Sequence, residues 1–163
     1  MVRHRLARMG MSSLVELLAK EPMRQHVIED CVELIEAQVK TKGFIIKSAY
    51  ATIKAIKKRF IPEVVDTMLD EWLGKLQPHY ERWSTNKTSS FADYVVARGD
   101  VVAEDLLSVT DARAERTSHT TAKKMYSRMR DGAKKNVIEA IPALGKMIEK
   151  HLASVPKQPS ATA

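Results

Sequence analysis

Apolar side chains recur at intervals of three or four residues along most of this chain. Because an α-helix has about 3.6 residues per turn, this spacing places them on one helical face, which helices bury by packing together. The longest series is Met125, Met129, Ala133, Val137, Ile141, Leu144, Ile148 and Leu152, and another is Ile45, Ala49, Ile53, Ile56 and Phe60. The pattern predicts an all-α fold.

Prolines and capping residues divide this pattern into segments. Ser13 and Glu16 have the spacing of a capping box, in which each side chain binds a free backbone amide where a helix begins. Pro62 and Pro78 would each cost a helix a backbone hydrogen bond, so we expect a new helix at Pro62 and a separate short turn, residues 78–83, at Pro78. The apolar spacing continues across Pro142, which predicts one kinked helix or two helices sharing a buried side. We predict a single compact, proline-punctuated bundle of about six to eight amphipathic helices.

The length of 163 residues suits one domain with one core. We predict that residues 12–153 form the helical bundle, with a polar loop at 84–90. Residues 1–11 are basic, and residues 154–163 are rich in proline and small polar side chains. A disordered leader and a disordered tail are therefore expected on either side of the bundle.

Several classes of site are disfavoured by what the sequence lacks. Cys31 is the only cysteine, which excludes an intramolecular disulfide and a zinc site built from thiolates. No apolar run approaches the roughly 20 residues that span a bilayer. Glu-x-x-His, His-Glu-x-x-His, Gly-x-Ser-x-Gly and glycine-rich phosphate-binding motifs do not occur. We expect a cytoplasmic protein with no metal and no cofactor.

Two polar clusters are the candidates for an unfamiliar catalytic site. The first comprises His26 and Glu29 with Cys31 nearby, and the second comprises His79, Tyr80, Glu81 and Trp83. We interpret His26 as a surface histidine and Cys31 as a small buried hydrophobe. In the second cluster the aromatic rings are expected to pack in the core or at its rim, with their polar edges wet.

Charge is the feature that most suggests a binding function, with a net charge of +7. The chain has seven Lys or Arg and no acid between Lys40 and Arg59, and seven against Asp131 alone between Arg116 and Lys135. Two basic helices are therefore predicted, and an anionic partner is the simplest explanation for them. The candidate partner-binding residues are Lys47, Lys54, Lys57, Lys58, Arg59, Lys123, Lys124, Arg128, Lys134 and Lys135.

The function predicted from these features is a non-enzymatic binding or scaffolding protein that engages an anionic partner, or itself, through its basic helices. A second copy or an acidic protein ranks first as partner, nucleic acid second, and anionic lipid is also open. Two alternatives remain. The methionines, including Met125, Met129 and Met147, could line a cavity that carries a hydrophobic ligand or lipid between helices. An enzyme with an unrecognised site is the other alternative.

Three stretches resemble a family of small uncharacterised bacterial helical proteins. They are GFIIKSAY at 43–50, FIPEVVD at 60–66 and LSVTDAR at 107–113. The similarity extends from about Leu14 to Leu152. The resemblance implies a helical fold and a bacterial origin, and it implies no site residues because that family brings no activity with it.

Overall fold

The computed structural model describes residues 12–155, and every regular element in that range is helical. The elements are α2 (Leu14–Leu18), α3 (Met23–Lys40), α4 (Phe44–Lys54), α5 (Phe60–Thr85), α6 (Phe91–Ala97), α7 (Gly99–Arg116), α8 (Thr120–Met129), the 3-10 turn η1 (Arg130–Gly132) and α9 (Ala133–Ser154). The all-α bundle prediction is confirmed. The predicted leader and most of the predicted tail lie outside the described residues.

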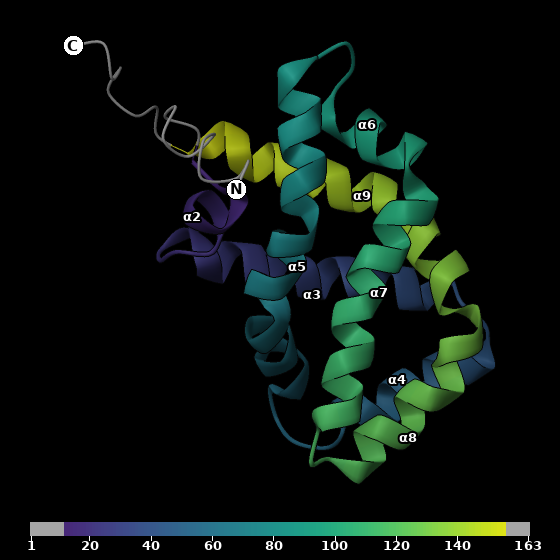
Figure 1. The fold of residues 1–163 in the computed structure, drawn as a ribbon. Helices are drawn as coiled ribbons and strands as arrows, with labels where there is room; N and C mark the ends of the chain where they lie inside the picture. Colours follow the sequence, from purple (N-terminus) through teal and green to yellow (C-terminus); the bar gives the residue numbers. More distant parts are fainter. Residues whose placement is uncertain (1–11, 156–163) are drawn as a thin grey trace.

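The long helices cross one another, and the shorter ones cover their ends (Figure 1). α5 packs against α7, α3 packs against both α5 and α9, and α6 packs along α9. α4 packs mainly against α8, at the end of the molecule opposite α6 (Figure 1). The core lies where α2, α3, α5, α6, α7 and α9 meet, and its most buried large apolar side chains are Leu14, Leu18, Val27, Val65, Phe91, Val95, Val102, Ile141 and Ile148.

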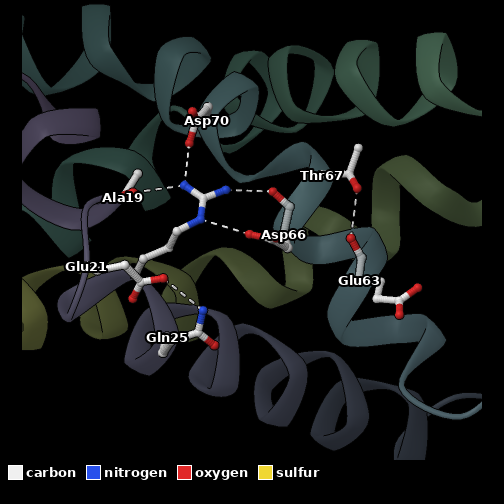
Figure 2. A network of polar contacts seen from close by, with 8 residues as sticks. Ala19, Glu21, Gln25, Glu63, Asp66, Thr67 and Asp70 are labelled. Carbon is white, nitrogen blue, oxygen red and sulfur yellow. Dashed lines mark hydrogen bonds and ion pairs between the residues drawn. The ribbon is translucent and has the colours of Figure 1, made fainter.

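Arg24, in the first turn of α3, fastens that helix to α5. Its guanidinium donates hydrogen bonds to the Asp66 and Asp70 carboxylates, at 2.8 and 2.7 Å, and to two backbone carbonyls, of Ala19 and Asp66 (Figure 2). The Arg24 side chain is only 18% exposed, and the hydrogen bond to Asp70 is the main cause that raises its pKa. Such a fork of donors fixes direction as well as distance, so it sets the position of α3 beside α5.

Proline interrupts the helices less than the sequence predicts. α5 continues through Pro78 to Thr85, so the prediction of a new segment at that proline is wrong. Leu73 and Leu76 before the proline and His79 after it are all buried on the same helix, and burial of this continuous face outweighs one lost hydrogen bond. At Pro142 the sequence allowed one kinked helix or two helices. The structure has one helix, α9, with the proline inside it.

The buried face of α4 differs from the predicted one at one position. Ile45 is 66% exposed, although the predicted stripe includes it, and Phe44 is 83% exposed. Successive helical residues are about 100° apart, so Ile46 and not Ile45 continues the covered side that holds Ala49 and Ile53. The expectation for Ile45 was therefore wrong, and the start of α4 presents two large apolar side chains to solvent.

Gly145 allows α6 to approach α9 closely. A Cβ atom at this position would lie 2.7 Å from Cα of Ala92 and 2.9 Å from its Cβ. The neighbouring atom is backbone, which cannot move aside as the end of a side chain can. Only glycine fits at this crossing.

We predict that Gly145→Ala destabilises the protein by about 1–3 kcal/mol, because the added methyl group forces α6 and α9 apart. The measurement is the free energy of unfolding in urea. Gly74→Ala is the matched control, since Gly74 is also inside a long helix but a Cβ atom added there would have no neighbouring atom within 4 Å. It should stabilise by about 0.5–1 kcal/mol through helix propensity. Equal effects from the two substitutions would contradict the close contact.

Candidate functional site

A cavity of about 330 Å³, partly open to solvent, lies between α3, α5, α7, α8 and α9, with Ile46 of α4 and Leu18 of α2 in its wall. Most of its lining is aliphatic. The wall includes Val27, Leu34, Ile35, Leu69, Leu73, Leu106, Leu107, Val137, Leu144 and Ile148. On each helix these residues are one, four or seven positions apart, which places them on one helical face, so the predicted stripes supply the wall. The stripes therefore pack against one another in the core and also leave part of their surface facing this space.

Methionine takes part in this wall. Met129 and Met147 line the cavity, whereas Met125 is buried but does not line it. Unbranched, polarisable methionine side chains adapt to ligands of different shapes. Two of the three methionines named in the carrier alternative therefore lie in the wall of this cavity.

Most polar side chains in the lining are occupied by other protein groups. Tyr126 donates its hydroxyl to Oδ1 of Asp111 at 2.6 Å, and burial raises the pKa of this tyrosine. Lys42 forms an ion pair with Glu139. These bonds draw the polar atoms out of the cavity surface, which leaves it more apolar than its residue types suggest.

Gln38 and Asn136 differ from these residues. Both line the cavity, and neither side chain makes a hydrogen bond within residues 12–155. An amide offers both a donor and an acceptor, so either residue can bind a polar atom of a ligand.

Two histidine–aspartate pairs join helices across the bundle. Nε2 of His79 on α5 lies 2.7 Å from Oδ2 of Asp105 on α7, and Nε2 of His151 on α9 lies 2.7 Å from Oδ2 of Asp30 on α3. His151 also lines the cavity, and Lys150 binds the same oxygen of Asp30 at 2.8 Å. Sequence reasoning missed this pair, since the partners are 121 residues apart and no local motif marks them.

The predicted clusters are placed as packing and surface residues. His26 and Glu29 are both exposed, and neither forms an ion pair or side-chain hydrogen bond in the described part of the chain. Tyr80 and Trp83 pack with Phe91, with ring centroids 5.5–5.7 Å apart. Among residues 12–155, no three His, Cys, Asp or Glu side chains are grouped so as to hold a metal ion.

The predicted basic residues fall into two groups. Three are engaged inside the molecule: Lys54 with Glu36 at 2.6 Å, Lys57 with Glu63 at 2.8 Å, and Lys134 with Asp100 and Glu104 at 3.4 and 3.0 Å. The others are exposed and make no ion pair with any residue that the structure describes; they are Lys47, Lys58, Arg59, Lys123, Lys124, Arg128 and Lys135. Because α4 and α8 pack together, most of these cations come from one pair of neighbouring helices (Figure 1).

Fold and cavity together define an all-α protein built around an apolar hollow. Over residues 14–152 the chain matches the family described as "Family of unknown function (DUF6918)", and it belongs to that family. The resemblance seen in the sequence, over the same span, is thereby confirmed. No curated protein and no solved structure matches the chain.

We predict that the Cys31 thiol reacts slowly in the folded protein. Cys31 lines the cavity, and burial raises its pKa to about 12, so almost no thiolate exists at neutral pH. With an aromatic disulfide reagent at pH 8, labelling should be about a hundredfold slower than in urea, where the same thiol is free. Equal rates in the two conditions would show that the thiol is not shielded.

We also predict that the Asp30 bonds make stability depend on pH. The hydrogen bond from Lys150 is the main cause that lowers the pKa of Asp30 below its ordinary value of 3.8. The stabilisation is therefore complete above that ordinary value and is lost as pH falls through the lower, folded value. Asp30→Asn should reduce the free energy of unfolding at pH 7, and its difference from the wild type should shrink below about pH 4. Glu29→Gln, at an exposed position on the same helix, should change neither quantity.

Proposed function

We propose that this protein binds a predominantly apolar small molecule in the cavity between α3, α5, α7, α8 and α9. The observation that carries the proposal is the apolar wall around about 330 Å³ of space. This volume falls within the range of about 300–1,000 Å³ that is usual for ligand sites. An apolar cavity holds water poorly, so an apolar ligand gains contacts there without displacing well-bound water.

The composition of the wall narrows the class of ligand. Leu, Ile, Val and Met side chains offer dispersion contacts without directional demands, which suits an aliphatic or mixed hydrocarbon body. Gln38 and Asn136 add a few hydrogen-bonding groups. We therefore expect a ligand with a long apolar part and one small polar group, such as a lipid-derived molecule.

This proposal selects the carrier alternative among the functions predicted from the sequence. An enzyme is less well supported, because Nε2 of each paired histidine is held by an aspartate. The Ser108 and Ser154 hydroxyls beside the two pairs donate to the backbone carbonyls of Asp105 and His151, not to an imidazole nitrogen. Binding of an acidic protein or a second copy remains a prediction, as do a bacterial origin and a cytoplasmic location.

A pair of substitutions on α9 tests the proposal. Ala140 lines the cavity, whereas Ala143, three residues further on, is exposed and outside the lining. We predict that Ala140→Phe fills the space and weakens binding of a fluorescent apolar probe by about tenfold or more, while Ala143→Phe leaves binding unchanged. The probe is 1-N-phenylnaphthylamine, and circular dichroism checks that both variants stay helical.

Native mass spectrometry of protein purified from its own host supplies the second readout. Retention of a lipid-like molecule by the wild type, and its loss in Ala140→Phe, is expected. The proposal is overturned if the wild type neither binds the probe nor retains an apolar molecule, or if both phenylalanine variants bind the probe as the wild type does.

A further inference from the structure

α4 and α8 form one surface that is free of acidic residues. No Asp or Glu occurs in residues 40–59 or in residues 117–130, the two segments that contain these helices. The segments are far apart in the chain, but the helices pack side by side at one end of the molecule (Figure 1). We call the exposed faces of α4 and α8, together with the connection 55–59 that follows α4, the basic surface.

Only some of the cations on the basic surface form ion pairs within the protein. Lys54 and Lys57 reach Glu36 and Glu63 on neighbouring helices. Six other cations are exposed without an ion pair among the described residues, and they are Lys47, Lys58, Arg59, Lys123, Lys124 and Arg128. Unpaired like charges gathered in one place repel one another, so an anionic partner would relieve an existing cost.

Two large apolar side chains stand at the edge of this surface. Phe44 is 83% exposed and Ile45 is 66% exposed, both in the first turn of α4. Lys47 is three residues after Phe44, which puts the two side chains on the same side of the helix. Further along, the outward side of α4 carries the small residues Ser48, Ala51 and Thr52, which leave room for close approach to a flat partner.

We propose that the basic surface docks on an anionic lipid bilayer, with Phe44 and Ile45 entering the interface between headgroups and acyl chains. Lysine and arginine side chains would bind the headgroup phosphates, each adding to the attraction. An interfacial helix needs apolar side chains flanked by cations, and this combination is what α4 offers. No helix between residues 12 and 155 is long and apolar enough to span a bilayer, so the contact would be peripheral.

A bilayer fits these features better than nucleic acid does. Phosphate groups of a duplex would satisfy the cations, but they would leave Phe44 and Ile45 in water, where their exposure gains nothing. A bilayer accepts both kinds of group at once. The proposal does not require a ligand in the cavity, although Ile46 on α4 and Met129 on α8 line that cavity and would bring it close to the membrane.

The test is sedimentation of the full chain with vesicles made of equal parts phosphatidylglycerol and phosphatidylcholine, compared with pure phosphatidylcholine vesicles. We expect binding to the anionic vesicles only, and its loss in high salt. Lys47→Glu combined with Lys123→Glu should weaken binding by about tenfold or more. The matched control is Lys75→Glu with Lys146→Glu, since these exposed lysines on α5 and α9 also lack an ion pair in the described chain.

A second pair of variants tests the apolar contribution. Phe44→Ser with Ile45→Ser should weaken vesicle binding by about tenfold while the remaining binding stays sensitive to salt. Val96→Ser with Val101→Ser removes two exposed apolar side chains, 45% and 55% exposed, from α6 and α7, and should have no effect. Circular dichroism verifies the fold of each variant.

Three results would overturn the membrane proposal. One is equal binding to anionic and neutral vesicles, or binding to neither. Another is equal weakening by the lysine pair on the basic surface and by the control pair. The third is tighter binding to a DNA duplex than to anionic vesicles in a fluorescence anisotropy titration, with the Phe44 and Ile45 variant binding the duplex as the wild type does. Failure here leaves the cavity proposal intact, because apolar probe binding is measured without vesicles.

Discussion

The contact between α9 and α6 positions the helix on which the rest of the structure depends. Gly145 brings the backbone of α6 against one flank of α9, and Ile141, on the same flank, is buried. Ala140 and Leu144 lie on another flank of the same helix and face the cavity. One side of α9 therefore lies against α6 with no room for a side chain at Gly145, and a second side faces the cavity. Close packing at one helix crossing does not require close packing at the others, so a cavity can remain beside it.

The sequence predicts the helices well because burial of one face repeats with the period of the helix. The sequence predicts less well which of two adjacent apolar residues is buried. Ile45 and Ile46 both fit an apolar stripe, and only the packing of α4 in the folded protein shows which one is covered. Pro78 illustrates the same limit for helix ends, because its local cost is overcome by residues that become buried only in the assembled bundle.

The candidate site has a different relation to the sequence. The methionines suggested a cavity, but an apolar stripe reads the same whether it meets another stripe or encloses space. The pair of His151 and Asp30 has no sequence signature, since each residue belongs to a different helix and 121 positions separate them. The basic segments could be recognised individually, whereas their union on one surface depends on the path of the chain through α5, α6 and α7.

That path has a consequence for how the molecule is made. α4 and α8 are neighbours only after the chain between them has folded, and each helix has a single well-buried residue of its own, Ala49 and Met125. Neither helix gains enough from its own burial to hold its place alone. The cationic face is thus a property of the finished molecule, absent from a partly synthesised chain or a proteolytic fragment. A partner that required this face would therefore bind only the folded protein.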